Sequence, residues 1–249
     1  MYLAMWSGPR NVSTAMLRAF GQRSDTAVSD EPLYAAYLAT TGKQHPGREA
    51  ILASQPTDYA LLREILTGPI PGGRTVWYQK HMAHHLVPEA RGPWLSRLTH
   101  CFLVREPDEM LSSLLKVWPD AELEDTGLPQ QVALFEQIRT QTGTLPPVLD
   151  GRAVMDNPQG SLMALCQSVG IPWDSGMLAW PAGPRATDGV WAPYWYSAVR
   201  ASTGFAPWRP REIDIPTEKE HLRQACRELY ERLVPHLLKP LPDQGGREP

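Results

Sequence analysis

Two kinds of hydrophobic pattern alternate along the chain. Short apolar runs with strand character occupy residues 2–6, 26–29, 74–81, 98–106 and 146–152. Segments with helical spacing occupy residues 13–23, 58–66, 107–118, 130–140, 158–170 and 217–238, and a further one begins near Pro32. Nearly continuous apolar strands that alternate with helices are typical of a parallel sheet covered on both faces. We therefore predict an α/β fold of three layers, with a central parallel sheet flanked by helices.

The pattern fails between residues 171 and 215, where proline, glycine and aromatic residues follow one another without a period. A loop of this length inside a globular chain is usually functional or lid-like. No internal repeat or shift in composition marks a boundary. We therefore expect a single domain over residues 1–240, followed by a flexible tail at 241–249.

Composition limits the classes of function. With 249 residues, 42% of them hydrophobic, the chain can bury a sizeable core, and its formal charge of −3 does not suggest a nucleic-acid-binding or membrane-anchoring face. Cys101, Cys166 and Cys226 are too widely spaced for a disulfide framework or a metal motif, so we expect buried free thiols. No apolar run approaches the roughly 20 residues of a membrane span, and no signal peptide is visible, which favours a cytoplasmic protein.

The first predicted strand ends in the turn Ser7-Gly8-Pro9-Arg10-Asn11, which leads into the first helix. Loops at the carboxyl ends of parallel strands are the usual ligand sites of such sheets, and a helix start attracts anions. Here the turn combines the backbone freedom of glycine with a guanidinium and several side-chain donors. The candidate anion-binding residues are Gly8, Pro9, Arg10, Asn11, Ser13 and Thr14. The alternative is an ordinary capped helix in which Ser13 serves as N-cap.

A second segment, Cys101-Phe-Leu-Val-Arg-Glu-Pro-Asp-Glu-Met-Leu-Ser-Ser, repeats this arrangement. Arg105 stands at the carboxyl end of the most apolar strand, beside a helix with Pro107 at its first position. Ser112 and Ser113 follow within that helix. A strand-end arginine and a helical serine can together bracket a second phosphate.

In this order the two segments resemble the P-loop-like sulfotransferases, in particular small bacterial-type members. These enzymes use 3'-phosphoadenosine-5'-phosphosulfate (PAPS). The family loop, of the type P-[KR]-[SA]-G-[TS]-[TS], would here be Pro9 to Thr14, with Val12 in place of the usual glycine. The resemblance implies that this loop binds the 5'-phosphosulfate, and that Arg105 binds the 3'-phosphate with Ser113, or alternatively Ser112. It also implies a late nucleotide-binding loop, for which Arg185, Gly189 and Trp191 are the candidates unless that segment is only aromatic packing.

Two segments supply candidate catalytic groups. Asp30 and Glu31 end the second predicted strand, and the resemblance to carbohydrate-type members makes Glu31 the first choice of general base, although either carboxylate would also suit the cap of a helix with Pro32 at its first position. Lys80 and His81 end the third strand. His81 is the alternative base, with Lys80 to steady the sulfate, and the resemblance to the K-x-H segment of animal cytosolic members supports it.

His84 and His85 follow closely, and we expect them to line an acceptor pocket or to serve in packing. A zinc site with His81 is disfavoured because no cysteine or second cluster lies near, so we expect no metal.

We therefore predict a sulfotransferase that moves a sulfuryl group from PAPS to a hydroxyl or amine of a small acceptor. The alternatives are a related protein that binds PAPS or adenosine 3',5'-bisphosphate without turnover, and a small-molecule kinase with a degenerate phosphate loop. We expect no nucleic acid or membrane partner. The sequence is compatible with a homodimer but does not predict one. An apolar or ring-shaped acceptor would suit the aromatic residues near the site, which are Trp77, Tyr78, Trp191, Tyr194, Trp195 and Trp208.

Overall fold

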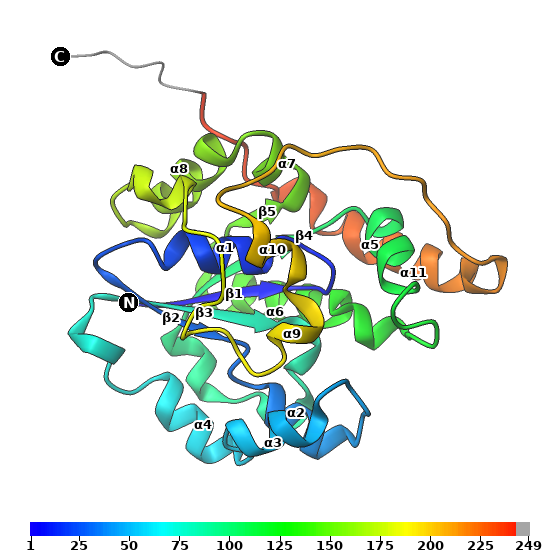
Figure 1. The fold of residues 1–249 in the computed structure, drawn as a ribbon, viewed down its shortest axis with the longest axis horizontal. Helices are drawn as coiled ribbons and strands as arrows, with labels where there is room; N and C mark the ends of the chain where they lie inside the picture. Colours follow the sequence, from blue (N-terminus) through cyan, green and yellow to red (C-terminus); the bar gives the residue numbers. More distant parts are fainter. Residues whose placement is uncertain (243–249) are drawn as a thin grey trace.

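The computed structural model describes residues 1–242, and its centre is a parallel sheet of five strands (Figure 1). The strand order is β2-β3-β1-β4-β5, and every neighbouring pair is parallel. The strands are β1 (Tyr2–Ser7), β2 (Thr26–Asp30), β3 (Val76–Met82), β4 (Thr99–Val104) and β5 (Val148–Asp150). The predicted parallel α/β sheet is confirmed, with strand ends that differ by a few residues from the sequence pattern.

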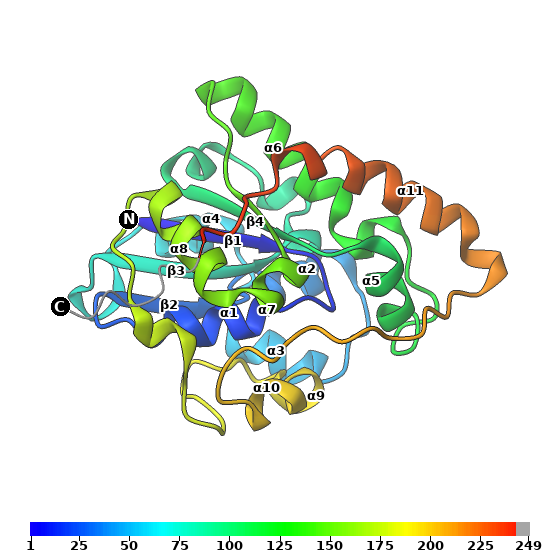
Figure 2. The same ribbon diagram turned by 90° about the horizontal axis from the view of Figure 1, so that it is seen from above.

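Helices cover both faces of this sheet, as the view from above shows (Figure 2). The helices are α1 (Ser13–Phe20), α2 (Tyr34–Thr41), α3 (Arg48–Ser54), α4 (Tyr59–Leu66), α5 (Pro107–Leu114), α6 (Leu128–Thr142), α7 (Gly151–Asp156), α8 (Pro158–Val169), α9 (Ala192–Trp195), α10 (Ser197–Ala201) and α11 (Glu220–Glu231). Short 3₁₀ turns lie at Pro71–Gly73, Ala83–His85, Pro88–Ala90, Pro93–Arg97, Leu123–Thr126, Ser175–Leu178, Thr217–Lys219 and Val234–His236.

The alternation of side chains along each strand divides the core into two layers. On β1, Leu3 and Met5 pack with α1 and α8, whereas Ala4 and Trp6 pack with α4 and α6. On β3, Tyr78 belongs to the first layer and Trp77 to the second. Because one step along a strand changes the layer, neighbouring residues at a strand end face different surroundings.

Several boundaries differ from the sequence pattern. Helix α1 ends at Phe20 and α5 at Leu114, and only Glu220–Glu231 of the final amphipathic segment forms an α-helix. The helices α3 and α7 were not predicted, nor were the short helices α9 and α10 within residues 171–215. Of the predicted tail, residues 243–249 lie outside the described part of the chain.

The predicted irregular segment is confirmed, and it crosses the carboxyl-end side of the sheet. Its short helices α9 and α10 lie in front of that side in Figure 1. Trp191 and Tyr196 from this segment are buried against Tyr34 and Tyr37 of α2. A segment without periodic pattern is thus fixed by aromatic packing, which places its side chains beside the strand ends.

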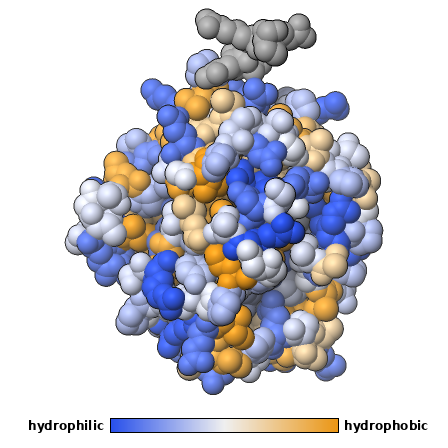
Figure 3. Space-filling model, turned by 90° about the vertical axis from the view of Figure 1, so that its left-hand side faces the viewer, coloured by the Kyte–Doolittle hydropathy of each residue, from blue (hydrophilic) through white to orange (hydrophobic). Residues whose placement is uncertain are grey.

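The surface at the opposite, amino-terminal side of the sheet mixes both kinds of residue. Hydrophilic residues cover much of that face, with hydrophobic ones scattered among them (Figure 3). Within residues 1–242 no helix combines the length and the apolar character needed to cross a bilayer.

Candidate active site

The two strand-to-helix turns meet at one place because β1 and β4 are adjacent strands. The Nε of Arg10 donates a hydrogen bond of 2.9 Å to the Oγ of Ser113. The guanidinium of Arg105 donates to the backbone carbonyl of Arg10. The two predicted anion cradles therefore form a single site.

Close packing fixes the loop between β1 and α1. A Cβ on Gly8 would lie 2.6 Å from the carbonyl oxygen of Thr126, so only glycine fits without a shift of backbone. The side-chain Oδ1 of Asn11 accepts from the Val12 amide at 2.8 Å, and its Nδ2 donates to the Leu103 carbonyl. Arg10 has a φ of 56°, in the left-handed region that non-glycine residues rarely adopt.

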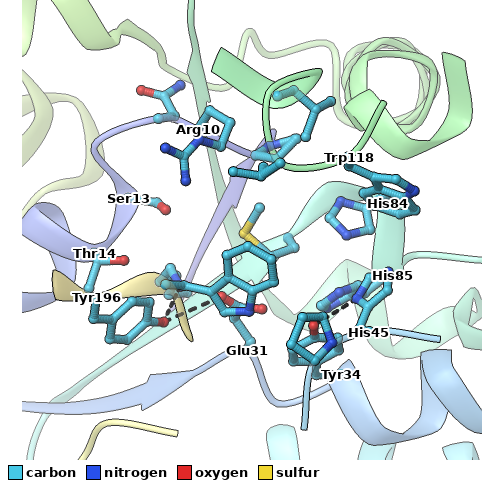
Figure 4. A pocket seen from close by; sticks show the side chains of 18 of the residues that line it. Arg10, Ser13, Thr14, Glu31, Tyr34, His45, His84, His85, Trp118 and Tyr196 are labelled. Atoms are coloured by element: carbon cyan, nitrogen blue, oxygen red, sulfur yellow. Dashed lines mark hydrogen bonds and ion pairs between the residues drawn. The ribbon is translucent and has the colours of Figure 1, made fainter. Parts of the chain in front are cut away.

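Ser13 does not cap α1, because the N-cap is Val12 and no side chain caps this end of the helix. The alternative role for Ser13 is therefore wrong. Ser13 and Thr14 instead line a cavity of about 230 Å³, together with Pro9, Arg10 and Asn11. In Figure 4, Arg10, Ser13 and Thr14 lie on one side of this cavity, and three histidines lie on the other. We call it the histidine cavity, after His45, His84 and His85 in its wall.

A buried ionic cluster opens into the histidine cavity. The Nζ of Lys80 donates to Asp30 Oδ1 at 2.8 Å, to Glu31 Oε1 at 2.6 Å and to the Tyr196 hydroxyl at 2.8 Å. Both Lys80 and Glu31 line the cavity. Helix α2 has Leu33 as N-cap and begins at Tyr34, so neither carboxylate caps it and Pro32 is not its first residue. The alternative that Asp30 or Glu31 caps this helix is therefore wrong, and both carboxylates are hydrogen-bonded to Lys80.

Burial and charge shift the proton affinities in this cluster. Burial raises the pKa of Glu31, and the neighbouring charge of Asp30 adds to this, while Lys80 opposes both. Burial disfavours the charge of Lys80, but Asp30 and Glu31 outweigh it and hold the pKa of the amine well above its ordinary value. Lys80 thus stays a cation, and Glu31 is a more basic carboxylate than one in water. Its backbone φ of 42° is also left-handed.

A second cavity of about 480 Å³ adjoins the first across Arg10, Asn11 and Thr14. Its wall includes Arg105, Ser113 and Val12, and also two arginines from the irregular segment, Arg209 and Arg211. We call it the arginine cavity. The pKa of Arg10 is lowered by burial and then by the positive charges of Arg105 and Arg211. Guanidinium groups crowded in this way form a ready site for a polyanion.

Other contacts hold the walls of the arginine cavity. Arg105 also pairs with Glu109 at 3.1 Å, and the indole of Trp208 donates to the same carboxylate. Ser112 lies outside the cavity wall. Its hydroxyl accepts from the Asp214 amide at 3.0 Å, and so ties the irregular segment to α5. The structure therefore brings Ser113, and not Ser112, to the candidate site.

Arg209 and Arg211 were missed by the sequence reasoning. The signal available was the stretch Trp208-Arg-Pro-Arg, which places two cations beside an aromatic residue in the irregular segment. Only the packing of that segment shows that they line the same cavity as Arg10, which lies about 200 residues earlier in the sequence.

His81 does not lie with the other candidates. It follows Lys80 on β3 and therefore faces the opposite layer, where its ring stacks on Trp6 with centroids 4.3 Å apart. Its Nε2 lies 3.2 Å from Gln79 Oε1, and the ring is buried. The structure separates His81 from both cavities.

The late-loop candidates also lie away from both cavities. Trp191 is buried in the aromatic cluster against α2 and donates to the Tyr196 hydroxyl at 3.0 Å. The Gly189 amide donates to Asp30 Oδ2, and the Arg185 guanidinium donates to proline carbonyls. Of the six aromatic candidates, Trp195 lines both cavities and Trp208 lines the arginine cavity. Trp77 and Tyr78 are in the core. Tyr194 is 54% exposed, and its ring lies beside Gly47.

The histidines that follow β3 do line the site. His84 and His85 are buried in the wall of the histidine cavity, and His45 joins them from the loop between α2 and α3. In the described part of the chain, no three histidine, cysteine or acidic residues are grouped as a metal site.

Comparison with known proteins identifies the family. The family model described as "Sulfotransferase domain" matches residues 1–234. The chain belongs to this family. The predicted family is therefore confirmed, and the two strand-to-helix turns both lie within the matched part of this sulfotransferase-family chain.

Two plant proteins are similar over most of this chain. Branched-chain-amino-acid aminotransferase-like protein 1 of Arabidopsis thaliana is 35% identical over 233 residues. Branched-chain-amino-acid aminotransferase-like protein 2 of the same plant is 33% identical over 233 residues. In both cases the match covers 93% of this chain and 41% of the plant protein. The chain thus spans about two fifths of the length of these relatives.

Solved structures agree with the fold. The sulfotransferase domain from the curacin biosynthetic pathway has a TM-score of 0.53 at 14% identity, covering 97% of this chain and 98% of that one. A sulfotransferase from Alicyclobacillus acidocaldarius has a TM-score of 0.52 at 12% identity, covering 96% of each chain. These likenesses establish the architecture of a sulfotransferase for this chain.

Proposed function

We propose that this protein transfers a sulfuryl group from PAPS to a small acceptor. The observation that carries the proposal is the junction of the two cavities at Arg10. Anion-binding groups from two turns line one side, and a buried carboxylate–lysine cluster opens on the other. Family membership supports a transferase, and the arrangement of charges supports this particular donor.

The arginine cavity suits the nucleotide end of the donor. Arg105 and Ser113 would bind the 3'-phosphate, and Arg211 is close enough to Arg10 to perturb its pKa. The crowded guanidiniums repel one another, so a bound phosphate would relieve this repulsion. Arg10, Ser13 and Thr14 lie where the cavities meet and would hold the phosphosulfate near the start of α1.

The histidine cavity suits the acceptor. When bound, PAPS supplies the sulfuryl group, whose bond to the bridging phosphate oxygen breaks as the bond to the acceptor oxygen forms. Glu31 takes the proton of the acceptor hydroxyl, for which its raised pKa makes it a suitable base. Lys80 holds Glu31 in place and keeps positive charge beside the transferred group. Arg10 stabilises the charge that develops on the leaving phosphate.

Calorimetry tests the donor assignment. We expect adenosine 3',5'-bisphosphate to bind, and the Arg105→Ala variant to weaken its binding at least tenfold more than that of adenosine 5'-monophosphate. The reason is that Arg105 is assigned to the phosphate that the second ligand lacks. Equal losses for the two ligands would contradict this assignment. Tighter binding of ATP–Mg²⁺ with no response to the bisphosphate would point to the kinase alternative instead.

A further inference from the structure

The irregular segment contributes a side chain to the buried ionic cluster. Tyr196 lies between α9 and α10, is 4% exposed, and lines the histidine cavity together with Lys80 and Glu31. Its hydroxyl lies 2.8 Å from the Nζ of Lys80 and 2.7 Å from Oδ2 of Asp30. In Figure 4 this hydroxyl points toward Glu31. A residue 116 positions after Lys80 therefore completes the surroundings of its amine.

The Lys80 amine is fully occupied within this cluster. An ammonium group has three protons to donate. Its three acceptors, all within 2.8 Å, are Asp30 Oδ1, Glu31 Oε1 and the Tyr196 hydroxyl. The Lys80 side chain is 1% exposed, so these protein groups take the place of water around it. Together they fix the direction of the amine, and Tyr196 is the uncharged one of the three.

The Tyr196 hydroxyl is also fully occupied. As an acceptor it receives the Lys80 amine and the indole of Trp191, which lies 3.0 Å away. Its own proton is then donated to Asp30. Burial raises the pKa of Tyr196 well above its ordinary value, although Lys80 opposes this, so the hydroxyl keeps its proton. Each of its hydrogen bonds therefore runs in one direction, which suits a group that orients its neighbours.

The segment is attached to the sheet independently of this hydroxyl. Asp188 forms a buried ion pair with Arg18 of α1 at 2.7 Å. The ring of Trp191 lies edge-on to that of Tyr34, with centroids 5.2 Å apart. Because these contacts hold the segment, the Tyr196 hydroxyl is not needed to attach it. Its loss is therefore expected to alter the ionic cluster and to leave the segment in place.

The network leaves one oxygen of Glu31 without a partner. Oε1 accepts from the Lys80 amine at 2.6 Å and lies 3.4 Å from the Tyr196 hydroxyl. Within residues 1–242, no side chain or amide donates a hydrogen bond to Oε2. Since Glu31 lines the histidine cavity, Oε2 is the oxygen that a ligand there can use.

We infer that Tyr196 is a positioning residue, whose hydroxyl directs the Lys80 amine to Oε1 of Glu31 and so keeps Oε2 free for the proton of the acceptor. This inference rests on the proposed function and deepens it, because it makes the irregular segment part of the catalytic arrangement. The role belongs to the hydroxyl and not to the ring. Without the hydroxyl, one proton of Lys80 loses its acceptor and the amine is free to turn toward Oε2.

Hydrogen exchange of the Lys80 amine tests the inference without a substrate. In protein labelled with ¹⁵N at lysine, a buried amine with all protons bound exchanges slowly and gives a resolved signal. Its nuclear Overhauser contact with the Tyr196 ring, whose centroid lies 5.1 Å from Nζ, assigns that signal. We expect Tyr196→Phe to speed the exchange about tenfold, because one proton loses its acceptor. Fast exchange in the wild type, or equal exchange in Tyr196→Phe, would overturn the inference.

The matched control is Tyr194→Phe, which removes a hydroxyl two residues earlier in the same segment. Tyr194 is 54% exposed and lines neither cavity. Exchange of the Lys80 amine should therefore be the same in this variant as in the wild type. If Tyr194→Phe speeds the exchange as much as Tyr196→Phe does, the effect belongs to the segment as a whole and the role of Tyr196 is refuted.

Turnover separates positioning from a merely structural role. With labelled PAPS and an acceptor found by screening hydroxylated compounds, Tyr196→Phe should lower kcat roughly tenfold and leave the KM for PAPS within about twofold. Displacement of the whole segment would instead raise this KM too, because residues 198–211 of the segment contribute to the wall of the arginine cavity. Tyr194→Phe should change neither constant. An unchanged kcat in Tyr196→Phe would overturn the positioning role.

The two measurements also separate this inference from the proposed function. If adenosine 3',5'-bisphosphate does not bind the wild-type protein, the donor assignment is wrong, and exchange of the Lys80 amine still decides whether Tyr196 holds the cluster. If the bisphosphate binds with equal affinity to wild type and Tyr196→Phe, the variant is folded. An unchanged exchange rate or kcat in that folded variant would refute the role of Tyr196 and leave the donor assignment intact.

Discussion

The two cavities that meet at Arg10 solve opposite problems of recognition. The arginine cavity gathers several guanidiniums, whose charge does not depend on pH in any ordinary range, whereas the histidine cavity is lined by neutral imidazoles and aromatic rings. The highly charged donor that we propose suits the first environment, and an acceptor that must approach a buried carboxylate suits the second. The two cavities adjoin across Arg10, Asn11 and Thr14, so one site can treat its two ligands differently.

The largest expected effect is in the histidine cavity, at Glu31. Glu31→Gln keeps the size of the side chain but removes the base, so sulfuryl transfer should fall about 10²–10⁴-fold. Turnover is measured with labelled PAPS and an acceptor found by screening hydroxylated compounds. Bisphosphate affinity should stay within twofold of wild type, because Glu31 belongs to the histidine side. The exposed Glu64→Gln is the matched control, and transfer that survives in Glu31→Gln would remove the assigned base.

A fall in pH should change the charge of the imidazoles but not that of the arginines. Burial lowers the pKa of His81 and His84 to about 3 and of His100 to about 4, and it lowers that of His85 well below 6.5. Below about pH 6.5 these histidines therefore bind more protons in the unfolded chain than in the folded protein. Their contribution to the free energy of unfolding is fully present above that pH and is lost as the pH falls.

When the pH falls from 7.5 to 6.0, each of these four imidazoles should lower the free energy of unfolding by about 0.8 kcal/mol, or by about 3 kcal/mol together. Glu31 and Asp150 act in the opposite sense because burial raises the pKa of each, but they are two groups against four. Urea unfolding at the two pH values measures the difference. A free energy of unfolding that does not change between pH 7.5 and 6.0 would show that these histidines are not neutral and buried.

The smallest effect should come from the rim of the arginine cavity. Arg211→Ala removes one cation from a partly exposed wall, and we expect adenosine 3',5'-bisphosphate to bind about tenfold more weakly, near the lower limit for a charged hydrogen bond. The control is Arg185→Ala, whose guanidinium donates only to proline carbonyls. If Arg185→Ala weakens the nucleotide as much as Arg211→Ala, the late loop suggested by the sequence contributes after all.

The sequence was most informative where function depends on neighbouring residues. The turn after β1 and the turn after β4 are each continuous, and the order of apolar strands and helices predicted that both lie at one edge of the sheet. The structure brings together Arg10, Ser13, Thr14, Arg105 and Ser113, as the two segments suggested. Glu31 directly follows β2, Lys80 lies near the carboxyl end of the adjacent strand β3, and the two form a direct ion pair.

Prediction was weaker where contacts depend on the tertiary fold. His81 and Lys80 are neighbours in sequence, but the strand turns them to opposite faces, and no local pattern told which face carried the site. Arg209 and Arg211 depend on how an aperiodic segment packs, which the hydrophobic period cannot describe. The same segment buries Trp191, which the family resemblance had suggested for the nucleotide.

The left-handed backbone at Arg10 and Glu31 has a practical consequence for engineering. Such a conformation costs a non-glycine residue about 1–2 kcal/mol, a cost that glycine would avoid. A laboratory selection for heat resistance alone would therefore be drawn toward glycine at position 10, whereas glycine at position 31 would also remove a partner of the buried Lys80. Such a selection would yield a more stable molecule that has lost the Arg10 guanidinium, so position 10 should be held fixed when this protein is engineered for stability.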